Sequence, residues 1–323
     1  MDINEEKIKG EVSNFVNSLQ RLLPRKKELP FFLERPKPKV TKLSDIHAEA
    51  KNTFPRCFIG AKIVILRDIM ERVKLVQQYN FGRPKDVHKC FSQVIHKELE
   101  PHNTDEGLFI DSTGSATATY KEKLDAGYEM RLTSRIKDLV SSETEIVFEK
   151  ENQQSVGSFA CFVKDVDPNT LRLVTQWTYK VLPEMCIGTE IGFKPLSYPL
   201  VADFSISSRY EKPTFALSST VSRYGIQVCF FKQFAPDLRL GTIVSQGARN
   251  GQMNVSLALH KNYMNGSELK IFVDSNRCGG FTFQKDVLFH EPHNEIRVLR
   301  LTGSTLIDRQ RRVRFGIGFN LDF

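Results

Sequence analysis

Histidine, cysteine and glycine patterns that could carry out chemistry occur in this sequence, but their spacing argues against it. Residues 290–293 bring two histidines together, yet Pro292 prevents the helix that a zinc-binding H-E-x-x-H motif needs. Gly316 and Gly318 lie too close to the end of the sequence for a phosphate-binding helix to follow. The six cysteines contain no C-x-x-C pair, so we expect reduced thiols. We therefore predict no enzyme, no catalytic residue, no metal and no cofactor.

The composition is that of a folded chain. The 323 residues include 46 Lys+Arg and 38 Asp+Glu, a formal net charge of +8, and 40% are hydrophobic. No apolar run approaches the roughly 18–20 residues of a membrane-spanning helix. Basic residues alternate with acidic ones instead of forming a stripe, so we predict no nucleic-acid partner. The first residues lack the apolar core of a secretory leader and are too acidic for a mitochondrial presequence, so we expect neither.

The first 57 residues differ from the rest. We expect residues 1–43 to form an amphipathic helix, with apolar residues from Ile8 to Leu22 at helical spacing, and an extended linker rich in proline and lysine. A second, short helix is predicted over about residues 44–54. Ser44 would cap its start, and it would end before Pro55.

From Phe58 onward the apolar residues recur every second position. In the last stretch, residues 313–323, the odd positions are Val, Phe, Ile or Leu, and the even positions are Arg, Gly, Asn or Asp. Residues 128–137 and 200–210 alternate in the same way, and turn signals such as Asp167, Pro168 and Asn169 separate the runs. At about 14 residues per strand and turn, this part accommodates about 19 strands, each near the length that spans a bilayer.

A sheet with one apolar face can enclose a dry core or face lipid. About 19 strands would close around an interior too wide for side chains to fill, so a polar, water-filled interior and an apolar outer wall form the stable arrangement. Closure also removes edge strands, which lipid cannot satisfy. We therefore predict an all-β fold, a closed transmembrane β-barrel over residues 44–323. Two stacked β-sandwich domains are the alternative fold.

Four stretches of the sequence resemble one family. Residues 45–62 are similar to the segment that leads from a short helix into the first strand in the channel-forming subunit of the TOM complex, the mitochondrial outer-membrane protein-import translocase. Residues 272–276 and 111–116 resemble strand hairpins of that family. Residues 314–321 look like the sorting β-signal of mitochondrial outer-membrane barrels, with a polar residue, a glycine and two hydrophobic residues at fixed spacing. The likeness covers roughly residues 44–323 and indicates a divergent member of that family, within the mitochondrial porin superfamily.

This resemblance implies a 19-stranded barrel in the mitochondrial outer membrane with the helix of about residues 44–54 inside the pore. It implies that the first strand (about 58–68) pairs in parallel with the last (about 312–323). The family passes unfolded precursor proteins across the lipid bilayer without hydrolysing anything, works with receptor and small helical subunits of the TOM complex, and is commonly a dimer of pores. The residues carried over are, in the pore helix and first strand, His47, Lys51, Phe54, Pro55, Gly60 and Lys62, and in the β-signal, Arg314, Gly316, Phe319 and Leu321.

Strand alternation also predicts an acidic patch in the lumen. Its members are Glu129, Glu143, Glu145, Glu149, Glu190, Asp203 and Asp274. Such a patch would attract basic presequences at long range, and the attraction has to stay weak and divided over many sites. Basic residues of the same face match or outnumber these acids, so an anion-selective metabolite porin of the same superfamily remains an alternative function. A soluble, non-catalytic β-rich scaffold is the alternative from another class.

Overall fold

The computed structural model describes residues 40–70, 73–81, 107–111, 115–124, 127–137, 141–196, 201–248, 251–290 and 296–322. The chain divides into two units, Met1–Pro38 and Lys39–Phe323, and the description that follows concerns the second. The amphipathic helix and almost all of the linker predicted for residues 1–43 lie outside the described residues. Within the described part of the chain, no helix has the length and apolar character needed to cross a membrane.

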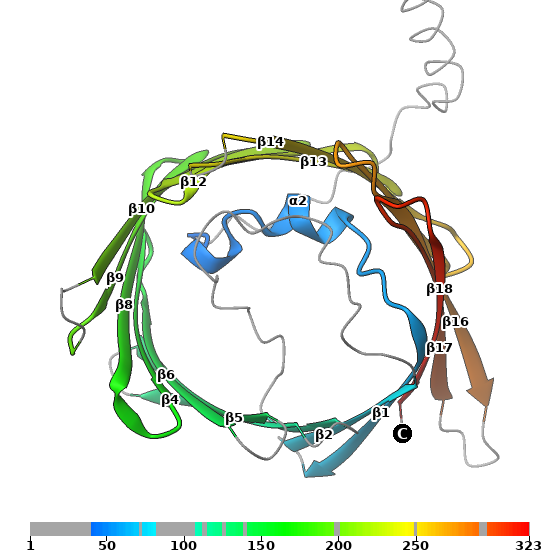
Figure 1. Cartoon of the computed structure of the whole chain (residues 1–323), viewed down its shortest axis with the longest axis horizontal. Helices are drawn as coiled ribbons and strands as arrows, with labels where there is room; N and C mark the ends of the chain where they lie inside the picture. The colour runs from blue at the N-terminus through cyan, green and yellow to red at the C-terminus, as the bar shows by residue number, and fades with distance from the viewer. Residues whose placement is uncertain are drawn as a thin grey trace, which may run out of the picture. The chain divides into compact units, whose positions relative to one another are not determined.

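The described residues of the second unit form a single closed sheet (Figure 1). Its strands are β1 (Gly60–Met70), β2 (Val73–Phe81), β3 (Gly107–Asp111), β4 (Ala116–Leu124), β5 (Tyr128–Lys137), β6 (Ser141–Glu151), β7 (Ser155–Lys164), β8 (Asp167–Leu182), β9 (Met185–Lys194), β10 (Val201–Lys212), β11 (Phe215–Ser222), β12 (Gly225–Ala235), β13 (Leu238–Gly247), β14 (Met253–Asn262), β15 (Glu268–Asp274), β16 (Gly279–His290), β17 (Ile296–Ile307) and β18 (Val313–Asp322). Each strand pairs with its neighbour in sequence, as in an up-and-down barrel. The predicted fold class, a closed β-barrel, is confirmed.

Two joints of the barrel are parallel. β1 pairs with β18 in parallel, from Gly60 opposite Gly316 to Leu66 opposite Asp322. β2 and β3 are also parallel, with Lys74 opposite Gly107, so both strands begin at the same end of the barrel. Antiparallel neighbours reverse direction at every step, so a ring with one parallel joint needs an odd number of strands and a ring with two needs an even number. The parallel closure that was predicted is therefore present in a barrel with 18 strands among the described residues, against the expected 19 or so.

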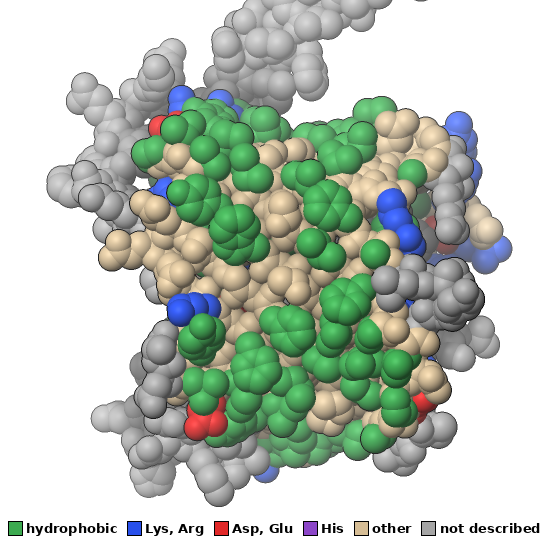
Figure 2. All heavy atoms as spheres, turned by 90° about the vertical axis from the view of Figure 1, so that its left-hand side faces the viewer, with side chains coloured by type: hydrophobic (Ala, Val, Ile, Leu, Met, Phe, Trp, Pro, Cys, Tyr) green, Lys and Arg blue, Asp and Glu red, His purple; other side chains and the backbone are tan. Residues whose placement is uncertain are grey.

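The alternation of the sequence separates an inner face from an outer face. On β14, Leu257 is 48% exposed, whereas its neighbour Ala258 is 1% exposed because it lies under a segment inside the barrel. On β18, Gly318 approaches the ring of Phe58 on the inside, and Phe319 is exposed on the outside, as the alternation predicted. Figure 2 shows hydrophobic side chains spread over the outer face of the barrel. An outer wall of this kind suits contact with lipid.

A short segment, residues 40–59, lies inside the barrel and is called the inner strap below (Figure 1). It contains a 3₁₀ turn, η1 (Leu43–Asp45), and one helix, α2 (Ala48–Thr53). Ser44 lies within η1 rather than at the cap of a longer helix, and the α-helix begins only after His47. It ends at Phe54, whose backbone is extended because Pro55 follows it. The predicted pore helix is therefore present, in a shorter form than residues 44–54.

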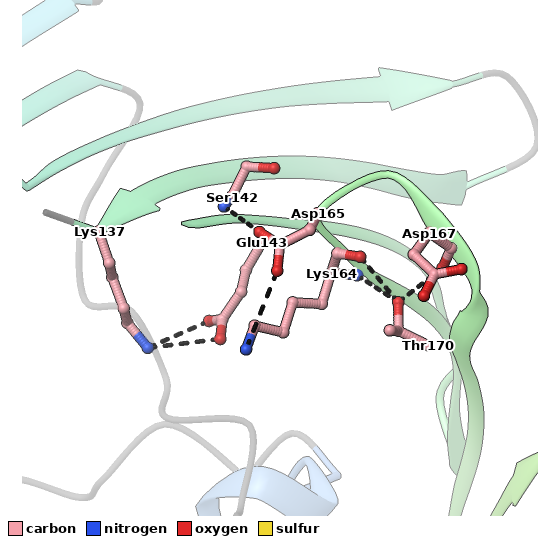
Figure 3. A network of polar contacts seen from close by, with 7 residues as sticks. All are labelled: Lys137, Ser142, Glu143, Lys164, Asp165, Asp167 and Thr170. Atoms are coloured by element: carbon pink, nitrogen blue, oxygen red, sulfur yellow. Dashed lines mark hydrogen bonds and ion pairs between the residues drawn. The ribbon is translucent and has the colours of Figure 1, made fainter. Parts of the chain in front are cut away.

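The hairpin between β7 and β8 illustrates how local hydrogen bonds end the strands (Figure 3). Asp165 and Val166 form its turn, both with positive φ angles, of 53° and 54°. The Asp165 carboxylate accepts a hydrogen bond from the backbone N–H of Ser142 at 2.7 Å, and this bond joins the turn to β6. The hydroxyl of Thr170 donates to the Lys164 carbonyl at 2.9 Å. The turn thus lies two residues before the predicted signal at Asp167, where β8 already begins.

Candidate functional site: the lumen and the inner strap

The inner strap crosses the inner wall from β6 to β18. Near its start, Lys42 forms an ion pair with Glu149 of β6, and the side chain of Leu43 lies against Gly188 of β9. In the middle, α2 packs on β12, β13 and β14. At its end, the backbone N–H of Phe58 donates a hydrogen bond to the Ser304 hydroxyl of β17 at 3.0 Å, and the ring of Phe58 covers Gly318. The strap therefore contacts one side of the lumen along its whole length.

His47 provides a polar attachment between the strap and the wall. Its Nδ1 lies 2.7 Å from the Ser218 hydroxyl and its Nε2 lies 2.7 Å from the Thr220 hydroxyl, both on β11. The Thr220 hydroxyl in turn lies 2.7 Å from that of Ser207 on β10. His47 is only 3% exposed, and burial lowers its pKa to about 3, with smaller contributions from the positive charges of Lys51 and Arg209. The imidazole is therefore neutral at physiological pH, and each ring nitrogen has a hydroxyl partner.

Arg209 of β10 forms the second polar attachment. Its guanidinium donates to the backbone carbonyl of Ile46 at 3.0 Å and forms ion pairs with Glu49 of α2 and Glu211 of β10, each at 3.0 Å. Arg209 is 5% exposed, so these contacts satisfy a buried charge whose isolation would be costly. Both acids contact the same guanidinium nitrogen, Nη2, and one comes from the strap and the other from the wall. The charge network thereby joins the beginning of α2 to the barrel.

The rest of the strap is held by apolar packing. Ala50, Phe54 and Cys57 form one buried cluster with side chains of the inner wall, which are Ala216, Cys229, Phe231, Ile243, Ala258, Phe272 and Leu306. These wall residues come from β11 to β15 and β17. An inner face with so many apolar side chains would be unfavourable against water, and the strap covers it.

Glycines of the wall make room for the strap. A Cβ atom at Gly241 of β13 would collide with the side chain of Thr53 and would lie 2.8 Å from the Ala50 carbonyl. Added Cβ atoms at Gly188 and Gly316 would collide with Leu43 and with the Phe58 backbone, respectively. By contrast, a Cβ at Gly247, also on β13, would meet nothing within 4 Å. The wall is thus shaped to receive this segment at several separate points.

The acids predicted on β5 and β6 are paired with bases of the same wall. Glu143 forms ion pairs with Lys137 at 3.4 Å and Arg135 at 3.8 Å, and Figure 3 shows the first of these. Glu145 pairs with Arg131 at 3.5 Å. Glu149 forms an ion pair with Lys42 of the strap. Glu129 lies opposite Glu149 in the strand register, on the same inner face. The structure thus brings these four acids together, but as members of a mixed-charge surface.

The three remaining acids are far from that group along the sheet. Glu190 of β9 accepts a hydrogen bond from Gln176 at 2.8 Å. Asp203 of β10 binds Arg223 at 2.8 Å and the Tyr224 hydroxyl at 2.9 Å. Asp274 accepts two weak hydrogen bonds from Asn276 at the turn after β15. β9 and β10 are adjacent, but β7 and β8 separate them from β6, and β11 to β14 separate them from β15, so the seven acids form several small groups and no continuous patch.

The residues carried over from the family resemblance fall into two places. His47, Lys51 and Phe54 belong to the strap, and Pro55 is buried beside them. Gly60, with a φ of 87°, starts β1, and Lys62 of β1 lies opposite Gly318. In the β-signal, Arg314 forms an ion pair with Asp308 at 3.6 Å, Gly316 lies beneath Phe58, and Leu321 lies opposite Ile65 and Leu299 on the outer-facing rows. Their proposed roles in sorting and transport remain predictions.

Sequence reasoning missed the wall residues that hold the strap. Ser218, Thr220 and Ser304 were ordinary polar positions of alternating strands, and nothing in the sequence distinguishes them from solvated ones. Arg209 carried a weak signal, because it is a charge on an inner face close to Glu211. Among the described residues, no group of three or more His, Cys, Asp or Glu side chains could hold a metal ion.

Comparison with known proteins gives two relatives of similar length. The chain is 22% identical over 287 residues to "Mitochondrial import receptor subunit TOM40 homolog" of Caenorhabditis elegans, which covers 85% of this chain and 91% of that protein. The homologue of Caenorhabditis briggsae matches with the same identity and coverage. A solved mutant porin of Rh. blastica aligns with a TM-score of 0.47 and 10% identity, over 62% of this chain and 86% of that one. No family model matches the chain. The two relatives confirm the resemblance noted in the sequence.

Proposed function

We infer that the chain is a TOM40-like β-barrel channel of the mitochondrial outer membrane, and we propose that it passes unfolded precursor proteins through its lumen. The observation that carries this proposal is the likeness to the two TOM40 homologues, which extends over 85% of the chain and 91% of each homologue. The closed sheet and its apolar outer face support a position in a bilayer.

The side of the lumen around β5 and β6 supports a role in transport of extended chains. Its inner face presents Arg131 and Arg135 next to Glu143 and Glu145, in pairs 3.5 to 3.8 Å apart. A passing polypeptide of either charge can exchange partners with these ion pairs. Because the carboxylates of Glu143 and Glu145 are already paired, neither of them binds the polypeptide strongly. Weak, repeated contacts of this kind allow a substrate both to enter and to leave.

We propose the other members of the system by the same reasoning. Receptor and small helical subunits of a TOM complex would surround the barrel in the membrane, and two barrels would associate as a dimer of pores. Arg314, Gly316, Phe319 and Leu321 would act as the signal for insertion by the sorting machinery. The chain itself would catalyse no reaction.

Crosslinking of an arrested precursor tests the proposal. Gln176 of β8 faces the lumen, where it bonds Glu190, and its neighbour Thr175 is exposed on the outer face. In a chain whose native cysteines are replaced, Gln176→Cys should crosslink to a precursor stalled in transit, and the matched variant Thr175→Cys should not. Absence of crosslinks from Gln176→Cys, with a precursor that still binds the membrane, would defeat the conduit proposal.

An anion-selective metabolite porin is the second candidate, because bases neutralise the acids of β6. Single-channel recordings in a planar bilayer separate the two. A preference for cations or weak selectivity agrees with precursor transport, because presequences are basic. A strong preference for anions would favour the porin.

A further inference from the structure

Several lysines on the outer face lie over aromatic rings. The proposed transport through the lumen does not require these contacts. The distance from each lysine Nζ to the ring centroid is between 4.4 and 5.8 Å. The pairs are Lys150 over Tyr128, Lys212 over Tyr210, Lys232 over Phe234 and Lys261 over Tyr263. A lysine above an aromatic ring presents its charge at the boundary between an apolar surface and water.

All four lysines lie at the same end of the barrel. They come near the last residues of β6, β10, β12 and β14. Consecutive strands from β3 to β18 are antiparallel, so these even-numbered strands run in the same direction and end on the same rim. At the other rim, within the described part of the chain, the cation over a ring is Arg223 above Tyr224, and Arg223 already binds Asp203. The arrangement is therefore one-sided.

Two of these lysines share one surface. Lys212 of β10 and Lys232 of β12 both lie opposite Phe215 of β11 in the strand register. Ring centroids of Tyr210 and Phe215 are 6.0 Å apart, and those of Phe215 and Phe230 are 6.4 Å apart. We call this surface the rim patch, and its members are Tyr210, Lys212, Phe215, Phe230, Lys232 and Phe234.

The rim patch faces outward. Its neighbours in sequence, Ala216 and Phe231, are buried against the strap on the inside, so Phe215 and Lys232 point to the opposite face. Two strand spacings, about 10 Å, separate Lys212 from Lys232. The lysines thus stand on either side of Phe215, near the rim of the outer face.

The charges of the rim patch are available for an anion. Among the described residues, neither Lys212 nor Lys232 forms an ion pair, although Lys212 hydrogen-bonds the Tyr210 hydroxyl and interacts electrostatically with Glu184 in the nearby β8–β9 turn. Lys261, two strands beyond Lys232, is partly neutralised by Asp237 at 3.7 Å. The pair Lys212 and Lys232 is therefore the part of this rim that best fits a phosphate group.

We propose that the rim patch binds the phosphate of anionic phospholipids, with acyl chains lying along the aromatic side chains below. This inference rests on the proposed function only in requiring that the barrel spans a membrane. The hydrophobic rings and the two lysines match the two parts of a lipid at the interface, whereas an acidic soluble protein would not need the rings. The one-sided arrangement predicts that such lipids gather at one leaflet.

Lipid titration of the full-length chain in detergent, followed by native mass spectrometry, tests the proposal with phosphatidylglycerol and phosphatidylcholine as probes. The native chain should bind phosphatidylglycerol more tightly. The double variant Lys212→Gln/Lys232→Gln should weaken its binding by about tenfold, because a basic residue near an anionic surface contributes several-fold. The matched control is Arg277→Gln/Arg309→Gln, which removes two exposed positive charges at the other rim.

The outcomes separate the possibilities. Equal losses in the two double variants would show that only net charge matters, and equal binding of both lipids by the native chain would show that the patch takes no anionic headgroup. Either result overturns the proposal. Circular dichroism and heat-dependent gel mobility of each variant establish that the barrel is folded. Precursor crosslinking from Gln176→Cys is independent of these measurements, so failure of lipid binding does not touch the proposed function.

Discussion

The close contact between α2 and Gly241 leads to a sharp test of how firmly the strap is held. Gly241→Ala places a methyl group where the side chain of Thr53 and the Ala50 carbonyl already lie. The carbonyl belongs to the helix backbone, so relief requires α2 itself to move. Overpacking of this kind costs about 1–3 kcal/mol. This free-energy cost destabilises the docked position of the strap, because the neighbouring strands hold β13 in place.

The native thiol of Cys57 reports this movement. Cys57 belongs to the end of the strap, its side chain is buried against the wall and its Sγ lies 3.7 Å from the Thr305 carbonyl, so a water-soluble maleimide reaches it only when the strap opens. In a chain with Cys57 as its only cysteine, a loss of 1–3 kcal/mol should raise the rate of labelling by roughly 5- to 150-fold. The rate is measured in proteoliposomes at fixed pH.

Gly247→Ala is the matched control, since the same substitution on the same strand meets nothing within 4 Å. Its labelling rate should equal that of the native chain. If Gly241→Ala labels Cys57 no faster than Gly247→Ala does, the close packing of α2 on β13 is refuted. Circular dichroism of both variants checks that the barrel itself is unchanged.

Three further outcomes follow from the strap and the wall. The lowered pKa of His47, about 3, means that the undocked strap binds more protons than the docked strap below about pH 6.5. The melting temperature should therefore fall from pH 6.5 towards 5 and stay level above pH 7, and the fall should be absent in H47Q. Gly316→Ala should lower the melting temperature by pushing against the Phe58 backbone, whereas Gly303→Ala, with its nearest neighbour at 3.9 Å, should not. Leu257→Arg puts a charge on the outer face and should destabilise the inserted barrel by about 2–4 kcal/mol in denaturant titrations if that face meets lipid, and by far less if it meets water.

The barrel could be predicted because its signal is local and repeated. Alternation along residues 313–323 fixes which side chains share a face, and the same rule applied to every strand leaves few ways to bury the apolar side. The number of strands was less certain, because it assumed a constant length per strand. Observed strands range from β3, with five residues, to β8, with 16, so the average hides large differences.

The turn before β8 shows a second limit of sequence reasoning. Asp167, Pro168 and Asn169 have the composition of a turn, and the Asp167 carboxylate does accept the Asn169 N–H at 3.0 Å. Proline is tolerated at the beginning of a strand, however, and the chain reverses at Asp165 and Val166 instead. The existence of a turn near these residues was predicted, but its position in the hairpin depends on the pairing of β7 with β8.

The contacts that hold the strap could not be predicted at all from one sequence. His47 and its partners Ser218 and Thr220 are 171 and 173 residues apart, and a hydroxyl on an inner face looks the same whether it meets water or an imidazole. The wall glycines have the same ambiguity, since a glycine in a strand can mark a bulge, a bend or a close approach. Only the register of the closed barrel shows which of them lie beneath the strap.

The strap and the ion pairs together change the physical picture of the lumen. The strap covers the apolar part of the inner wall, so under the proposed function a passing chain would meet mainly the polar strands such as β5 and β6. There, the carboxylates of Glu143 and Glu145 each have a neighbouring guanidinium or ammonium group, and the long-range field of these two acids is correspondingly small. If the chain transports precursors as proposed, their guidance must then come from short-range exchange of ion-pair partners. A wall of paired charges favours that exchange because breaking one pair and forming another costs little in water.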